Sequence, residues 1–187
     1  MNAQTLPHAV DSLFERAEGL DPVADRLSHG IAAAFRAGGE VGEAVEDVLH
    51  GRPIGHPLHP VLVEIPVGAW MAVGAMDTLE LLGVKGLEKG TNTVLAIGLA
   101  GAGGAILTGW TDWHETKGLP RRIGLTHGLM NEVAAVVYGA SLLARLRGRR
   151  RLGQVLAFGG LALIGVSAYL GGHLVYKHGV GVGGPMD

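Results

Sequence analysis

Six histidines are the residues whose type and spacing most readily support chemistry. They flank four apolar stretches, and they are His56, His59, His114, His127, His173 and His178. In an antiparallel bundle of four helices, the start of the first, the end of the second, the start of the third and the end of the fourth meet at one end. All six histidines then lie at that end, the histidine rim, which also contains Glu64, Asp112 and Glu115.

Two kinds of bound group fit such a rim. Imidazole is the commonest protein ligand for zinc, copper and iron, and carboxylates complete such shells. The predicted metal ligands are His56, His59, His114, His178, Glu64 and Asp112. Histidine is also an axial ligand of haem iron. For haem b, His127 and His173 are the favoured axial pair, with His59 as the substitute.

The haem hypothesis draws on two helical stripes. On the third stretch, His127 and Asn131 lie on one stripe, and on the fourth, Tyr169 and His173 do the same. The adjacent Gly171 and Gly172 offer a narrow backbone against which a flat cofactor would lie. The predicted cofactor-binding residues are therefore His59, His127, His173, Asn131 and Tyr169.

Each feature also has a structural explanation. Histidine, tryptophan and tyrosine suit the headgroup layer of a membrane. In the segment GHPLHP (55–60), the prolines favour an extended backbone at His56 and His59, and Pro60 can begin a helix. Glu64 is expected to face the protein interior or a water-filled cavity, or to be a charge near a helix end. Asp77 and Glu80 lie near the opposite end, where Lys85 or Arg145 would pair with them.

The elements that position these residues are predicted from composition. Of 187 residues, 48% are hydrophobic and only 17% are charged, against about 25% charged in an average globular protein. The four apolar stretches cover about residues 60–82, 92–110, 123–143 and 152–174, each near the roughly 20 residues that a membrane span requires. The sequence predicts an all-α fold, an integral membrane four-helix bundle, and a soluble bundle is the alternative.

The N-terminal part differs from the rest. Residues 1–52 contain nine acidic and four basic side chains and are predicted to form an amphipathic helical extension, followed by a four-span transmembrane domain at 53–187. Asp21 is predicted to cap one helix, with Pro22 at its first position. Val41, Val45 and Val48 form the apolar side of another helix. A partner domain, the bilayer interface or the rest of the chain would supply the surface that these helices need.

Several classes of function are excluded or disfavoured. The chain has no cysteine, which excludes thiolate zinc sites, cysteine-ligated iron–sulfur clusters and cysteine nucleophiles. A formal net charge of -2 gives no reason to expect a nucleic-acid partner. No catalytic triad or phosphate-binding loop is legible, so a hydrolase is the least favoured class and a redox carrier or binding module is preferred to an enzyme.

The distribution of basic residues predicts the orientation. Lys85, Lys89 and the arginines at 145–151 give seven basic residues on one side, and the opposite side has five. The positive-inside rule then places both termini and the histidine rim outside the cytoplasm.

Three segments carry a family resemblance. Residues 49–77, 108–131 and 169–183 resemble a bacterial family of four-span membrane proteins of unknown function with the GHPLHP signature. The resemblance implies a multi-pass protein of the bacterial inner (cell) membrane. Some relatives are fused to a Rieske-type iron–sulfur domain, which implies membrane electron transfer. This chain has no cysteine, so a redox role would require a separate redox partner protein or a bound cofactor.

The leading hypothesis is that the histidine rim binds haem b or a transition metal ion for membrane electron transfer. Two alternatives stay open. The first is a non-catalytic membrane assembly module, including a homo-oligomer, in which helices pack through Gly101 and Gly160. The second is proton or ion translocation through Glu64 and Glu132. The lipid bilayer is the expected environment in each case.

Overall fold

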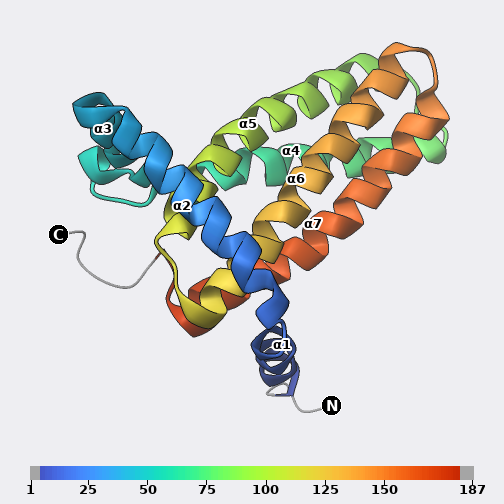
Figure 1. Ribbon diagram of the computed structural model, residues 1–187. Helices are drawn as coiled ribbons and strands as arrows, with labels where there is room; N and C mark the ends of the chain where they lie inside the picture. The colour runs from blue at the N-terminus through green and yellow to red at the C-terminus, as the bar shows by residue number, and fades with distance from the viewer. Residues whose placement is uncertain (1–4, 182–187) are drawn as a thin grey trace. The chain divides into compact units, whose positions relative to one another are not determined.

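The computed structural model describes residues 5–181, and the regular elements in this range are all helical. Seven α-helices are labelled in Figure 1: α1 Thr5–Glu15, α2 Asp21–Ala37, α3 Gly39–His50, α4 Leu58–Leu81, α5 Glu88–His114, α6 Gly118–Leu146 and α7 Arg150–His178. Two short 3-10 helices, Glu18–Leu20 and Arg52–Ile54, lie between them.

The four longest helices match the four predicted spans. Helices α4, α5, α6 and α7 have 24, 27, 29 and 29 residues and are apolar enough to cross a membrane. At 1.5 Å per residue, even α4 is about 36 Å long, which exceeds the roughly 30 Å of a hydrocarbon core. The prediction of an all-α membrane protein with a helical bundle is confirmed.

The chain divides into two compact units, each described by itself. Unit 1 comprises residues up to Leu58, Thr108–Gly128 and the chain from Ala168 onward, and unit 2 comprises His59–Leu107 and Leu129–Ser167. All four long helices therefore contribute residues to both units, α4 with only its first residue, Leu58, in unit 1. The proposed division of the sequence into 1–52 and 53–187 stays a prediction.

Unit 2 is built from four helical segments around one apolar core. Each helix contributes two buried residues: Trp70 and Val73, Leu95 and Ala102, Ala134 and Tyr138, Ala157 and Ile164. The rings of Trp70 and Tyr138 stack with centroids 4.2 Å apart. A Cβ at Gly98 would lie 2.6 Å from Trp70 Nε1, and one at Gly160 would lie 2.7 Å from Tyr138 Cε2. These glycines are therefore needed where large aromatic rings pack on neighbouring helices.

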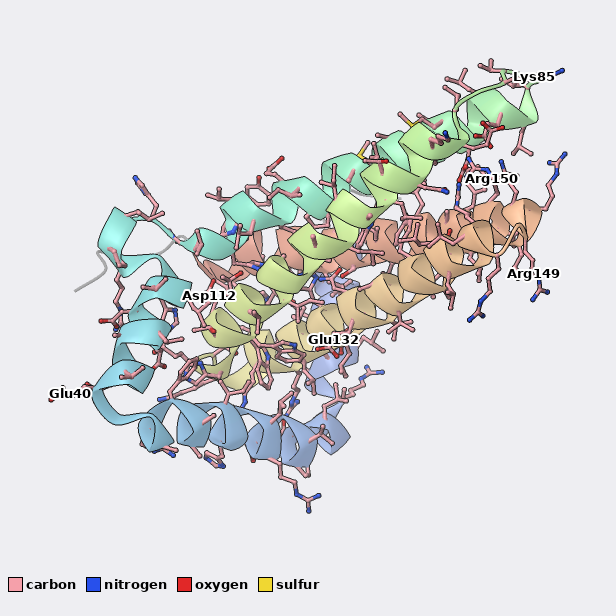
Figure 2. The ribbon with its side chains drawn as sticks, turned by 90° about the horizontal axis from the view of Figure 1, so that it is seen from above. Glu40, Lys85, Asp112, Glu132, Arg149 and Arg150 are labelled. Atoms are coloured by element: carbon pink, nitrogen blue, oxygen red, sulfur yellow. The ribbon has the colours of Figure 1, made fainter. Side chains whose placement is uncertain are left out.

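One end of unit 2 contains buried ion pairs. The side chains of Asp77 and Arg145 are both fully buried, and Arg145 donates to the two carboxylate oxygens of Asp77 through Nη1, at 2.8 Å, and Nη2. This confirms the predicted pairing of Asp77. Glu80 instead accepts a hydrogen bond from Arg150 Nε at 2.9 Å, because Arg150 begins α7 while Lys85 is exposed in a loop. Figure 2 shows Lys85 and Arg150 at the same end of unit 2.

In unit 1, helix α2 packs on the ends of the long helices. Its Ala24 forms a small buried core with Trp113 and Leu125, flanked by further apolar residues of α2 such as Leu27. Arg121 Nη2 donates to the Ala24 carbonyl oxygen at 2.9 Å. The rest of the chain therefore supplies the surface that this amphipathic helix needs.

The start of α2 differs from the prediction. Leu20 occupies the N-cap position and Asp21 is the first helical residue. The Asp21 carboxylate accepts hydrogen bonds from Arg122 Nε and Nη2, at 2.7 and 2.6 Å. The hydrogen bonds from Arg122 lower the pKa of Asp21 below its ordinary value. The prediction of Asp21 as an N-cap is wrong because the carboxylate is used in this long-range pair instead of in the first turn.

Helix α3 has its apolar side exposed. Val41, Val45 and Val48 are 72%, 47% and 54% exposed, whereas His50 is 8% exposed. Gly51 ends the helix with φ of 79°, and a Cβ there would lie 2.0 Å from the His56 carbonyl oxygen. Only glycine fits this turn. The turn fixes the end of α3 and with it the buried position of His50.

Candidate functional site

Within residues 5–181, two groups of three side chains place one histidine nitrogen or carboxylate oxygen each within 4.8 Å of one another. The first group is Glu46, His50 and His114, here the His50 cluster. The second is Asp11, His173 and His178, here the Asp11 cluster. Both groups lie in unit 1.

Two elements position the His50 cluster. Glu46 and His50 are four residues apart on α3, which places both side chains on one face of the helix. His114 is the last residue of α5. Asp112, whose carboxylate bonds to His50, lies at the end of α5 beside α3 in Figure 2.

Both imidazole rings are oriented through Nδ1. His50 Nδ1 lies 2.9 Å from Asp112 Oδ1, and His114 Nδ1 lies 2.5 Å from the Thr111 carbonyl oxygen. A carboxylate and a carbonyl only accept, so each Nδ1 carries the proton and Nε2 of the neutral ring presents a lone pair. Metal-binding histidines are typically oriented in this way, by a carboxylate or a backbone carbonyl on the other ring nitrogen.

The two Nε2 atoms face carboxylates. His114 Nε2 lies 3.2 Å from Glu46 Oε1, and His50 Nε2 lies 3.7 Å from Glu115 Oε1. The latter distance is too long for a hydrogen bond, and His50 Nε2 is buried without a hydrogen-bond partner among the described residues. A buried polar atom without a partner costs about 1–3 kcal/mol, and a bound cation would supply its partner.

The charge of the His50 cluster favours a cation. Three carboxylates, those of Glu46, Asp112 and Glu115, surround the two rings, so one negative charge remains even when both rings are protonated. The hydrogen bond to Asp112 is the main cause of a raised pKa at His50.

The Asp11 cluster has no such excess of negative charge. His173 Nε2 and His178 Nε2 lie 2.7 and 3.1 Å from the same Asp11 oxygen, and Lys177 Nζ lies 2.5 Å from the other. Burial alone would raise the pKa of Asp11, but the hydrogen bonds from Lys177, His173 and His178 outweigh it and lower that pKa. One carboxylate is already neutralised by Lys177, so this group is better suited to joining α1 to the end of α7 than to binding a metal ion.

The predicted haem residues are engaged in several contacts. His173 is bonded to Asp11, and the Tyr169 ring stacks on His173 with centroids 6.2 Å apart. The His127 ring packs on the backbone of Gly171, where a Cβ would lie 2.9 Å from Cε1. The narrow backbone at Gly171, against which a flat cofactor was expected to lie, is therefore in contact with the ring of His127.

The remaining predicted cofactor residue, Asn131, accepts a hydrogen bond from Ser167 at 2.9 Å in unit 2. The assignment of a haem site to these side chains stays a prediction.

The predicted metal ligands are distributed over several environments. His114 and Asp112 belong to the surroundings of the His50 cluster, and His178 belongs to the Asp11 cluster. In unit 2, His59 Nδ1 lies 2.9 Å from the Ala105 carbonyl oxygen. His56 and Glu64 are exposed. Their assignment as ligands stays a prediction.

Three residues of the two clusters were missed by sequence reasoning. Glu46 and His50 have the spacing of a ligand pair on a helix, but the apolar pattern of the same segment predicts only an amphipathic helix. Asp11 lies in α1, within the predicted helical extension of residues 1–52, where it is one of nine acidic side chains and no spacing distinguishes it. The i, i+4 spacing was the signal that would have found the first two.

The comparison with known protein families shows the family of the chain. Residues 55–184 match the family described as "Predicted membrane protein (DUF2231)". The chain belongs to this family. The DUF2231 match includes all four long helices and His114, whereas Glu46 and His50 precede it. No curated protein and no solved structure matches the chain.

Proposed function

We propose that this membrane protein binds a divalent transition-metal ion at Glu46, His50 and His114. The main support is His50 Nε2, which is buried without a hydrogen-bond partner among the described residues and lies beside carboxylates. Its ring is already oriented by Asp112, so binding an ion requires little reorganisation of the histidine.

The donor set indicates the class of ion. Two imidazoles and a carboxylate suit Zn²⁺, Fe²⁺ and similar divalent ions, whereas soft ions prefer thiolates. The chain has no cysteine to supply a thiolate. The ion would neutralise part of the negative charge of the cluster and provide a partner for His50 Nε2.

Membrane electron transfer is the second candidate function. A redox-active ion such as iron in the His50 cluster would serve it, and the resemblance to relatives fused to a Rieske-type domain supports such a use. Haem b bound by His127 and His173 is a further form of this candidate, and it would require His173 to release Asp11. In either form, we propose that a redox partner protein exchanges electrons on the extracytoplasmic side of the bacterial cell membrane.

The test is metal analysis of the full chain purified in mild detergent, before and after incubation with Zn²⁺ or Fe²⁺. We expect equimolar metal in the unmodified protein and its loss in His50→Ala. His29→Ala is the matched control, because His29 is exposed on α2. Absence of equimolar metal from the unmodified protein would refute the proposal, and a Soret band in the absorption spectrum would instead support haem binding.

A further inference from the structure

We infer that Glu115 is a fourth ligand of the same ion and that Asp112 is a positioning residue for His50. The inference rests on the proposed function and names its coordination. The site would then hold two imidazoles and two carboxylates around a tetrahedral ion, with no position left open for a substrate. Such a closed shell is typical of structural zinc sites and not of catalytic ones.

The distances between ligand atoms support the assignment of Glu115 as a fourth ligand. In an ideal tetrahedron with bonds of about 2.0–2.1 Å, any two ligand atoms lie about 3.3 Å apart. Glu46 Oε1 and His114 Nε2 are 3.2 Å apart, and Glu115 Oε1 and His50 Nε2 are 3.7 Å apart. Each pair is thus close to the length of one edge of such a shell. Glu115 is not among the three residues whose ligand atoms all lie within 4.8 Å of one another, so its carboxylate has to swing toward the other ligands to complete the shell.

The exposure of Glu115 allows that movement. Its side chain is 56% exposed, and the residue directly follows the end of α5 at His114. Neighbouring positions in this turn are fixed by the Thr116 amide, which donates to the Trp113 carbonyl oxygen at 2.9 Å. The carboxylate can therefore swing onto an ion while the backbone stays in place.

The four ligands come in two pairs. One pair, Glu46 and His50, is one turn apart on α3, and the other, His114 and Glu115, is adjacent in the chain at the end of α5. Neighbouring positive charge is already neutralised, because Arg52 is paired with Asp47. An ion in this place would join α3 to the end of α5.

Asp112 acts through His50 alone. Its carboxylate accepts a hydrogen bond from Nδ1–H of His50 and so directs the Nε2 lone pair toward the ion. Its replacement by asparagine keeps a hydrogen-bond acceptor and removes the charge. We expect a weaker site with unchanged ligands.

The experiment uses the full chain in detergent, stripped of metal and titrated with Co²⁺, followed by competition with Zn²⁺. Tetrahedral Co²⁺ absorbs strongly in the visible range, whereas octahedral Co²⁺ absorbs weakly. We expect the tetrahedral spectrum in the unmodified protein. Glu115→Gln should lose that spectrum and bind Zn²⁺ more than tenfold more weakly, while Glu43→Gln, an exposed change on α3, should alter neither.

Asp112→Asn separates positioning from ligation. It should keep the tetrahedral spectrum and weaken Zn²⁺ binding about 10- to 100-fold. An unchanged spectrum and affinity in Glu115→Gln, or an octahedral spectrum in the unmodified protein, would overturn the four-ligand assignment and leave the proposed function standing. No Co²⁺ or Zn²⁺ binding at all would refute both. The unfolding transition of the metal-free variants checks that each is folded.

Discussion

Replacing Asp77 by asparagine should strongly destabilise unit 2. Asp77 and Arg145 have no exposed side-chain surface, and the guanidinium donates to both carboxylate oxygens. The introduced asparagine would be a neutral partner with one acceptor oxygen, so the charge of Arg145 would be buried without compensation. Ser141 Oγ, 3.1 Å from Arg145 Nε, does not carry the missing charge.

The expected cost is about 3–5 kcal/mol, the range found when one member of a buried ion pair is removed. At 1.4 kcal/mol per factor of ten, this shifts the unfolding equilibrium by roughly two to nearly four orders of magnitude. The matched test is the double variant Asp77→Asn with Arg145→Met. Because it buries no unpaired charge, it should be more stable than the single variant.

The assay is an equilibrium unfolding titration with a denaturing detergent in mixed micelles. Tryptophan fluorescence is a suitable signal, because Trp70 lies in the core of the same unit. A cost below about 1 kcal/mol for Asp77→Asn would refute the reasoning, since such values belong to solvent-exposed pairs. A double variant less stable than the single one would equally show that charge burial is not the cause.

Three further predictions concern the metal, pH and packing. Zn²⁺ at 100 times its dissociation constant should raise the free energy of unfolding by about 2.7 kcal/mol, and His114→Ala should abolish this rise. The pKa of Asp11 is lowered from 3.8, so its stabilising contribution is present above that pH and is lost as the pH falls below it. Asp11→Asn should accordingly flatten the acid side of the stability profile measured by the same titration. Gly160→Ala should cost about 1–3 kcal/mol in that titration, because a Cβ would lie 2.7 Å from Tyr138, whereas Gly159→Ala, with nothing within 4 Å, should be neutral or stabilising.

The spans could be predicted from the sequence because the lipid environment requires long apolar helices, so the apolarity and length of a segment are enough to identify a span. The apolar stretch from 152 to 174 needs no knowledge of its neighbours to be recognised as a span, and it lies within α7. The pairing of Asp77 with a basic residue was also predictable, because the arginine-rich loop lies at that end of the spans, although the sequence left both Lys85 and Arg145 open as partners.

The candidate site was predictable only in part. His114 was expected to be a ligand, but its companions depend on how α3 packs in unit 1. The contact between His50 and Asp112 joins residues 62 apart, and that between Asp11 and His173 joins residues 162 apart. No periodicity in the sequence encodes such contacts. The capping role assigned to Asp21 failed for the same reason, because a distant arginine competes for its carboxylate.

The separation of the ligands along the chain has a consequence for biogenesis. Glu46 and His50 leave the ribosome before the first span, whereas His114 and Glu115 follow the second. A nascent chain that ends before α5 therefore has only half of the donor set. If the chain binds an ion as proposed, metal loading would take place after the first helical hairpin is inserted into the bilayer, and the ion would mark chains whose insertion has succeeded.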